Sequence, residues 1–326
     1  MDNSPTPWLD HSTFTAAVAA AVRAPSMHNS QPWRFRLRPD AVEVLADPAR
    51  ALPAADAAGW ATRIACGAAL FNLRLALAVR DITTDVTLLP DPRRPDLQAT
   101  LAPAPPMRPT QEQVRLERAI PHRQTNRYPF AEQTVSPSDR AALSTAATAE
   151  DARLDFATDP ATIDAIADLV READARLSSD EDYRSEILAW TRPGSDPSDG
   201  VPSAAGGLAA GGFELLSRRP YRADGHLTVR EYEREPLVAV LSLAGTWAAD
   251  DLRAGQALQH VLLAATDVGL AASMVSQPIE IPEIRDRLRG ILQTLPSPHM
   301  VLRFGYATAA PASGRRPVCE VIEDAA

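Results

Sequence analysis

Lysine is absent from this chain of 326 residues, so all 33 of its basic side chains are arginines, against 42 acidic ones. The net charge of −9 disfavours a nucleic acid as the main partner, because a phosphate backbone is bound by a basic face. An acidic chain can still hold one phosphate group through a few local arginines. Cys66 and Cys319 stand in no metal-ligand spacing, so we expect buried or bystander thiols rather than a disulfide or redox pair.

Several signatures of catalysis and targeting are missing too. The six histidines show no HxxH or HxxxH spacing, which disfavours a zinc enzyme and predicts no metal site. There is no GxSxG around Ser30 and no GxGxxG or P-loop, so a serine hydrolase or a Rossmann-type site is not expected. No apolar run reaches the length of a membrane span, and residues 1–4 do not resemble a signal peptide. These absences predict a soluble, cytoplasmic protein without a membrane partner.

Both helical and strand patterns occur along the chain. The length exceeds one average domain, and the proline-rich residues 103–109 are expected to link two halves. Residues 180–230 are rich in glycine and proline and are expected to be an irregular insertion. Helices are expected over residues 12–23, 60–79, 111–120, 137–148, 161–177, 253–268 and 282–290. Strands are expected over residues 33–37, 42–46, 86–89, 97–101, 154–157, 237–243, 272–275 and 300–306.

Two of the expected helices share a sequence pattern. Residues 67–78 align with residues 255–266 and carry identical residues at five positions, beginning with Gly67 and Gly255. Two buried helices rich in alanine and leucine would look alike by composition alone. The alternative is an internal repeat, which predicts that the two halves descend from one duplicated unit.

The most unusual stretch covers residues 24–35 and reads APSMHNSQPWRF. The helical pattern before it ends near Pro25, because the residue preceding a proline is pushed out of the α region. Serine, asparagine and glutamine side chains follow within a few residues, and Trp33 provides an apolar anchor. Such a stretch is suited to binding a small polar ligand, although a polar turn beside a core tryptophan would look similar.

This stretch resembles the APSxxNxQPWxF signature of the nitroreductase family of FMN-binding flavoproteins, and the whole chain resembles the Acg-type branch, in which two nitroreductase-like halves are fused. The resemblance implies an α+β nitroreductase fold with halves at residues 1–108 and 109–326, arranged as an intramolecular pseudo-dimer. Each half would then supply one central helix to the dimer core. In the family the signature contacts the flavin, which implies cofactor-binding roles for Pro25, Ser26, Met27, Asn29 and Gln31.

Three further segments resemble flavin-binding elements of the same family. Residues 123–127 (RQTNR) resemble its RxSxR/K element, which implies Arg123 at the phosphate, Thr125 in place of a serine, and Arg127 at the N1/O2 edge of the ring. A solvated basic turn is the alternative for this segment. Residues 314–317 (GRRP) resemble the basic pair that closes the phosphate site of the family. A flexible basic tail is the alternative for this segment. The remaining implied phosphate ligands are Arg315 and Arg316.

Residues 276–281 (SQPIEI) resemble the PIEGF stretch of the family, whose backbone amides face the flavin N5 and O4. Ile281 replaces the glycine of that stretch, so the surroundings of the ring are expected to be more crowded. The implied cofactor-binding residues here are Gln277, Pro278, Ile279 and Glu280.

The two halves carry complementary parts of such a site. The first half has the APSMHNSQPW stretch and no RxSxR element, whereas the second half has the other three segments and no such stretch. We therefore expect one FMN per chain, bound across the halves, and a monomer or weak dimer. Chemistry would occur by hydride transfer on the flavin, without a catalytic side chain.

The expected function is that of an FMN-dependent oxidoreductase acting on a small electron acceptor, with NAD(P)H as a candidate donor. Residues 180–230 would form a lid that restricts access if they lie over the flavin, or a surface excursion if they do not. The alternative function is non-catalytic flavin storage or sequestration beneath such a lid.

Overall fold

The structure is a computed structural model that describes residues 8–193, 198–206, 209–210, 221, 229–230, 237–293 and 295–323. Its first part contains α1 (His11–Ala21), β1 (Trp33–Leu37), β2 (Val42–Ala46), α2 (Trp60–Ala78), β3 (Thr84–Leu88), β4 (Leu97–Pro103) and α3 (Gln111–Ala119). Its second part contains α4 (Pro137–Thr148), β5 (Arg153–Ala157), α5 (Pro160–Ser179), α6 (Glu181–Ala189), β6 (Thr191–Arg192), β7 (Val201–Pro202), β8 (Ala209–Ala210), β9 (Val229–Arg230), β10 (Leu237–Leu243), α7 (Ala248–Asp267), β11 (Ala271–Val275), α8 (Gln277–Glu280), α9 (Pro282–Ile291), β12 (Ser297–Gly305) and β13 (Ile322–Glu323).

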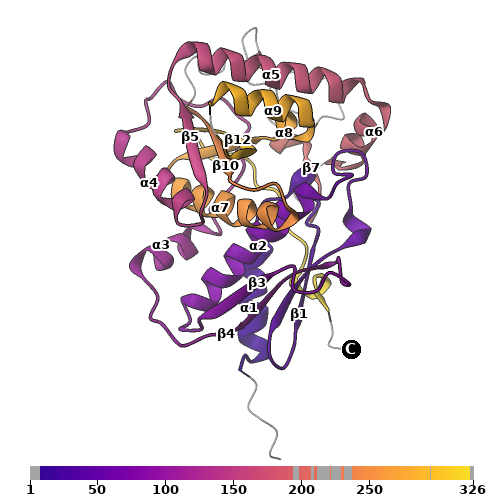
Figure 1. The fold of residues 1–326 in the computed structure, drawn as a ribbon, viewed down its shortest axis with the longest axis vertical. Coiled ribbons are helices and arrows are strands. Elements are labelled where there is room, and N and C mark those ends of the chain that lie inside the picture. The colour runs from indigo at the N-terminus through magenta and orange to yellow at the C-terminus, as the bar shows by residue number, and fades with distance from the viewer. Residues whose placement is uncertain are drawn as a thin grey trace, which may run out of the picture.

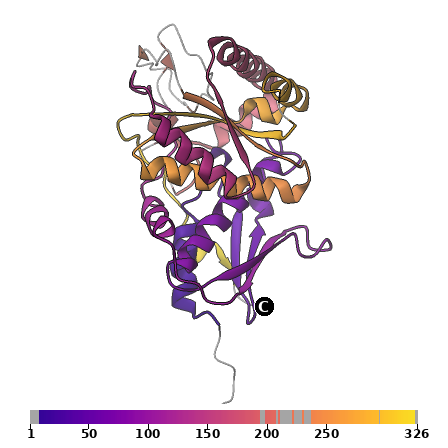
Figure 2. The same ribbon diagram turned by 60° about the vertical axis from the view of Figure 1, so that its left-hand side comes forward.

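Two sheets repeat one plan (Figure 1, Figure 2). The larger has the strand order β13-β1-β2-β4-β3, and the smaller has the order β11-β12-β10-β5. The elements follow in a corresponding order, α1-β1-β2-α2-β3-β4 in one and α4-β5-β10-α7-β11-β12 in the other. In the second, the elements from α5 to β9 are inserted between β5 and β10. In each, the first strand pairs with the second, the second with the fourth and the fourth with the third, always antiparallel. This shared topology agrees with the internal sequence repeat.

The C-terminal strand β13 departs from this plan. It pairs in parallel with β1, with Phe35 opposite Ile322, so the end of the described chain lies beside the sheet of the first half. The first sheet therefore contains residues from both predicted halves. The boundary between residues 108 and 109 stays a prediction.

The central contact between the halves is the packing of α2 against α7, and it depends on two glycines. A Cβ atom at Gly67 would lie 2.1 Å from the carbonyl oxygen of Leu252, and one at Gly255 would lie 2.1 Å from that of Ile64. Both distances are far below van der Waals contact, so only glycine permits this approach. The glycines that the sequence repeat aligns are thus the residues at which the two helices meet.

The helix α2 is the only helix in the described part of the chain that is long and apolar enough to cross a membrane. Most of that apolar stretch, 78%, is buried inside the protein, where α2 packs against α1 and α7. Its apolar residues on all sides are therefore explained by contacts with the rest of the fold.

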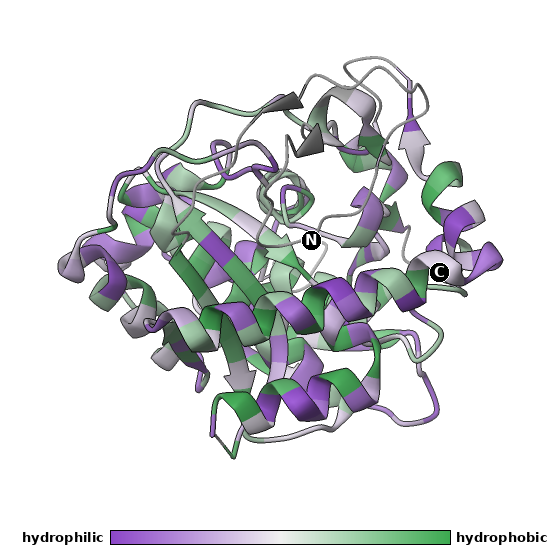
Figure 3. Ribbon diagram, turned by 90° about the horizontal axis from the view of Figure 1, so that it is seen from above, coloured by the Kyte–Doolittle hydropathy of each residue, from purple (hydrophilic) through white to green (hydrophobic). Residues whose placement is uncertain are grey.

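The smaller sheet is covered on both faces. Alternate residues of β10 point to opposite sides, so that Ala239 and Leu241 pack with α4 and α7 while Val238 and Val240 pack with α5 and α9. Every residue of β10 is buried, as its predominantly apolar sequence predicts, and Ser242 is its one polar residue. Figure 3 shows the strands mostly in the hydrophobic colour and the nearby helices striped by hydrophobic and hydrophilic residues.

The expected elements recur with shifted ends. The elements that were not expected are α6, the two-residue strands β6 to β9, the single-turn helix α8, and β13. The helix α6 lies in the predicted irregular segment; Asp180 caps it by accepting bonds from two backbone amides, and Tyr183 and Ile187 supply its buried face. The strand β13 has only two residues and exists through its pairing with β1, which no local pattern reveals. The rest of the predicted insertion falls largely outside the described residues.

Candidate functional site

The turn after α1 has an unusual backbone. His28, Asn29 and Gln31 have φ values of 52°, 54° and 52°, in the left-handed region that residues other than glycine seldom adopt. The amide of Gln31 donates to Ser26 Oγ at 2.9 Å, which closes the turn on itself. Such a conformation persists only where surrounding contacts enforce it, and it is often found at functional sites.

Those contacts come from distant parts of the chain. The Asn29 side-chain amide donates to the carbonyl oxygens of Gly200 at 2.9 Å and Gly314 at 3.1 Å. The Gln31 side chain donates to the carbonyl oxygen of Ser198 at 2.8 Å and accepts from the backbone amide of Arg316, also at 2.8 Å. The turn is therefore held between the inserted segment and the C-terminal segment.

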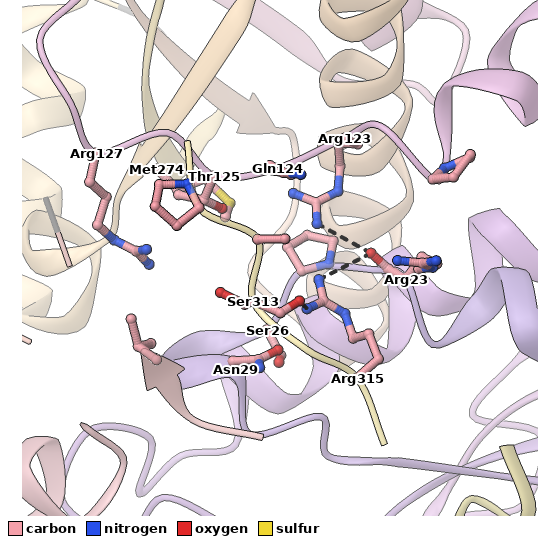
Figure 4. Close-up of a pocket in the computed structure, with 15 residues that line it drawn as sticks. Arg23, Ser26, Asn29, Arg123, Gln124, Thr125, Arg127, Met274, Ser313 and Arg315 are labelled. Carbon is pink, nitrogen blue, oxygen red and sulfur yellow. Dashed lines mark hydrogen bonds between the residues drawn. The ribbon is translucent and has the colours of Figure 1, made fainter. Parts of the chain in front are cut away.

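Two arginines from different segments converge at the end of α1 (Figure 4). Arg123 donates to the carbonyl oxygen of Arg23 at 3.2 Å, and Arg315 donates to the carbonyl oxygens of Arg23 at 3.4 Å and Ala24 at 3.3 Å. These carbonyls follow the C-terminal end of α1, where the helix dipole favours positive charge.

Neither arginine is ion-paired to a carboxylate in the described part of the chain. Burial and the nearby charge of Arg23 lower the pKa of Arg123 to about 10, and burial together with Arg123 and Arg23 lowers the pKa of Arg315 to about 9. Arg123 Nε and Nη1 and Arg315 Nε are buried without a protein hydrogen-bond partner. Buried guanidiniums of this kind are suited to binding an anion such as a phosphate.

A cavity in two connected parts opens beside these arginines. Its polar part holds about 620 Å³ of empty space, partly open to solvent, and its apolar part holds about 530 Å³. The polar part is lined by residues that include Arg123, Gln124, Arg315 and Ser313, and the apolar part by residues that include Met27, Trp60, Ile64, Leu258 and Met300. Pro25, Ser26, Thr125, Arg127 and Met274 line both.

The segment from Arg123 to Arg127 is fixed along the edge of β11. Thr125 forms a parallel bridge with Ala272, and the amide of Asn126 donates to the carbonyl oxygen of Ala272 at 2.8 Å. At the far end of the segment, Arg127 Nη1 donates to the carbonyl oxygen of Ala205 at 3.1 Å, and its guanidinium lies 5.1 Å from the centre of the Tyr221 ring. Arg127 therefore lies where the polar and apolar parts of the cavity join.

Most predicted cofactor-binding residues line this cavity, namely Pro25, Ser26, Met27, Asn29, Arg123, Thr125, Arg127 and Arg315. Gln31 lies behind the turn and supports it. Arg316 is directed elsewhere: its Nη2 donates to the carbonyl oxygen of Glu320 at 2.9 Å, and its Nη1 lies 3.5 Å from Asp47.

The predicted residues Gln277, Pro278, Ile279 and Glu280 form the single-turn helix α8 and line neither part of the cavity. The amides of Ile279 and Glu280 donate to the carbonyl oxygen of Ser276, at 2.8 Å and 3.2 Å, and only Ser276 reaches the apolar part. A cofactor role for these four residues stays a prediction.

Sequence reasoning missed several lining residues. Gln124 lines the polar part of the cavity, and its buried Oε1 has no protein hydrogen-bond partner. Its place between the predicted cofactor-binding residues Arg123 and Thr125 could have indicated this from the sequence. Trp60, Met274 and Tyr221 gave no such signal, because tertiary packing alone brings them to the turn.

Comparisons with known proteins identify the class. No family model matches the chain. It is 32% identical to the “Putative NAD(P)H nitroreductase Rv3131” of Mycobacterium tuberculosis over 96% of this chain and 92% of that protein. It is also 32% identical to the “Putative NAD(P)H nitroreductase acg” of the same organism, over 94% of each. The chain belongs to the nitroreductase superfamily. Within that superfamily it is an Acg-type protein.

Solved structures similar to the chain are also nitroreductases. One, from Bacteroides fragilis with bound FMN, has a TM-score of 0.37 and 14% identity, covering 62% of this chain and 93% of that one. Another, from Desulfitobacterium hafniense with bound FMN, has a TM-score of 0.38 and 15% identity, covering 62% and 94%. Likeness at this level carries no further conclusion. Membership of this family assigns the α+β nitroreductase fold to the chain.

Proposed function

We propose that the protein is an FMN-dependent oxidoreductase that binds one FMN across its two halves. The observation that carries this proposal is the pair formed by the buried Arg123 and the half-buried Arg315. Neither has a carboxylate partner in the described part of the chain, and both lie at the polar end of a cavity whose other end is apolar. A flavin mononucleotide has the same division, with an anionic phosphate at one end and a flat ring at the other. The names of the M. tuberculosis relatives, as NAD(P)H nitroreductases, support the same class of reaction.

The residues present fit this cofactor. Arg123 and Arg315 would hold the phosphate, because each has a buried guanidinium nitrogen with no protein acceptor. Gln124 would supply a further polar contact through its unpartnered side-chain oxygen. Bound FMN would supply hydride transfer. The apolar wall available to the ring consists of Met27, Trp60, Ile64, Leu258 and Met274.

The protein's own contribution to the reaction is positioning and electrostatics. Arg127 places a fixed cation where the two parts of the cavity join, so negative charge that develops on a bound ring would be stabilised there. The proposal therefore requires no side chain that acts as an acid or base.

The internal repeat relates this cavity to a second position in the fold. The side chains at that second position support a single FMN site per chain. There the turn from α4 to β5 faces α7 across a groove lined by Arg74, Glu150 and Arg253. Arg74 already donates to Gln256 at 2.6 Å and Glu150 at 3.2 Å, and Arg253 donates to Asp250 at 2.9 Å. Arginines satisfied by carboxylates are poorly suited to a phosphate. Because α2 already packs on α7 inside one chain, we also propose a monomer or weak dimer.

A second candidate function is flavin storage, or a reductase in which a lid restricts access to the flavin ring. Contacts of the predicted lid, residues 180–230, favour it. Asp199 pairs with Arg50 at 2.5 Å, Val201 lines the polar part of the cavity, and Tyr221 lines the apolar part. The hydroxyl group of Tyr221 lies 2.7 Å from His28 Nδ1. A cover at this place would limit stacking of a nicotinamide or an aromatic acceptor on the ring. Residues 194–197, 207–208, 211–220 and 222–228 of this lid lie outside the described residues.

The test compares reduction of the FMN-loaded protein by two reagents under anaerobic conditions. An oxidised-flavin spectrum that bleaches with NADPH or NADH and recovers with a quinone or nitroaromatic acceptor supports the oxidoreductase. Bleaching by dithionite alone supports storage. A protein that takes up no FMN contradicts both candidates.

A further inference from the structure

A second cavity lies at the seam between the halves, about two helical turns along α2 from the first. We call it the seam cavity and define it by the apolar residues Phe71, Leu75 and Leu116 and the polar residues Glu112, Glu150 and His260. They come from α2, α3, α7 and the turn after α4. The seam cavity holds about 840 Å³ of empty space, partly open to solvent.

His260 is the unusual residue of this cavity. It is 7% exposed, and neither ring nitrogen has a hydrogen-bond partner among the described residues. Nδ1 lies 3.7 Å from Glu150 Oε1 and Nε2 lies 3.8 Å from Glu112 Oε1, which is too long for hydrogen bonds. The imidazole is 4.9 Å from the ring of Phe71, centre to centre. A buried polar ring without partners is costly unless a ligand or a proton satisfies it.

The charges around His260 leave an excess of carboxylate. Arg74 is the one arginine among the described residues that lines the seam cavity, and its Nη1 is already bonded to Gln256 and Glu150. Although burial opposes it, His260 and Arg74 hold the pKa of Glu150 below its usual value, so this carboxylate is ionised at neutral pH. Glu112 is 54% exposed at the side chain and has no arginine partner in the described chain.

We propose that the seam cavity binds a small organic cation, namely a primary amine carried on an aromatic or alkyl group. The ammonium group would donate to Glu150 or Glu112, and an imidazole nitrogen that carries no proton would accept a further bond from it. The apolar part of the ligand would pack on Phe71, Leu75 and Leu116, and an aromatic face near the cation adds to the attraction. This site does not depend on the FMN proposal.

A metal ion fits the same residues less well. Among the described residues, no group of three or more histidine, cysteine or carboxylate side chains is arranged to hold a metal ion. The two carboxylates approach opposite nitrogens of one imidazole, so a single ion cannot use all three side chains.

The test is a calorimetric titration of the full-length chain with benzylammonium chloride at pH 7.5, beside benzyl alcohol and sodium benzoate. We expect benzylammonium to bind. The uncharged benzyl alcohol and the anionic benzoate should bind at least about tenfold more weakly, because they cannot donate charge-assisted hydrogen bonds to the carboxylates. Equal binding of all three, or no binding of benzylammonium, overturns the proposal.

Two variants locate the binding. Glu150→Gln and Glu112→Gln keep the size of the side chains and remove their charges, and each should weaken benzylammonium by about tenfold. Glu117→Gln, also on α3 but outside the cavity, is the matched control and should bind like the unmodified protein. Circular dichroism checks folding, and the exposed position of Glu112 keeps the test available if Glu150→Gln does not fold. Unchanged affinity in both variants contradicts the site.

Discussion

At the scale of single residues, the site depends on which of two side chains adjacent in the sequence faces the cavity. Arg315 and Arg316 are adjacent and chemically identical, yet one lines the polar part and the other contacts Asp47 and Glu320. The sequence assigns both to the phosphate, because a motif specifies residue types and not side-chain directions. The structure separates their roles.

This separation predicts different effects of two substitutions. Arg315→Ala should weaken FMN binding by about 10- to 100-fold, the loss of one charge-assisted contact, with little change in thermal stability. Arg316→Ala should instead lower the free energy of unfolding by about 1–3 kcal/mol, because it removes bonds to Asp47 and Glu320. Flavin fluorescence titrations and thermal melts measure both. The reverse pattern would show that Arg316 holds the phosphate.

A second residue-scale prediction concerns pH. Burial lowers the pKa of His299, whose Nε2 lies 3.7 Å from Asp251, below its ordinary value of 6.5. Between the lowered and ordinary values the unfolded chain binds more protons than the folded one, so stability is full above about pH 6.5 and falls as the pH drops. Urea denaturation from pH 8 to pH 5 should show this loss, and His299→Gln should show less of it. The same loss of unfolding free energy per pH unit in both proteins would contradict the assignment of this pH dependence to His299.

At the scale of elements, the decisive contact is the crossing of α2 and α7. The repeat of the two helices is visible in the sequence, because a local pattern of glycine, alanine and leucine survives in both copies. The sequence does not show that Gly67 and Gly255 touch, since that depends on how the helices approach in space.

Replacing these glycines tests the crossing. Gly67→Ala or Gly255→Ala should lower the free energy of unfolding by about 1–3 kcal/mol or more, because the new methyl group meets a backbone carbonyl that cannot move freely. Gly290→Ala is the matched control: it lies in α9 with nothing within 4 Å of its Cβ position, and should raise stability by up to about 1 kcal/mol. Chemical denaturation measures all three. Similar effects at the three positions would argue against close helix packing.

The sequence predicts the parts of the site that lie in one segment, but not the contacts between distant elements. Residues 24–35 and 123–127 were identifiable because several rare side chains stand close together in the chain. Trp60 and Met274 reach the same cavity from α2 and β11, and β13 reaches β1 from the far end of the chain. Contacts between residues this far apart leave no local pattern, so only the folded structure reveals them.

At the scale of the whole molecule, two copies of one α+β plan enclose unlike sites. The cavity beside Arg123 and Arg315 is cationic, whereas the related position beside Arg74 carries Glu150 and Asp151. The sequence analysis predicts a duplication from the repeated helix and from the complementary motifs of the halves, and the repeated strand order agrees with it. The charge reversal at the related position could not, because Glu150 and Arg74 meet only in the folded chain.

The most direct test of this account is the number of FMN molecules bound per chain. Purified protein is saturated with FMN, freed of excess cofactor, and analysed by flavin absorbance against protein concentration, beside Arg123→Ala/Arg315→Ala and the exposed control Arg93→Ala, whose side chain is 89% exposed. We expect about one FMN per chain in the unmodified protein and the control, and loss in the double variant. Two FMN per chain, or none, or full retention in the double variant would contradict a single site built across the two halves.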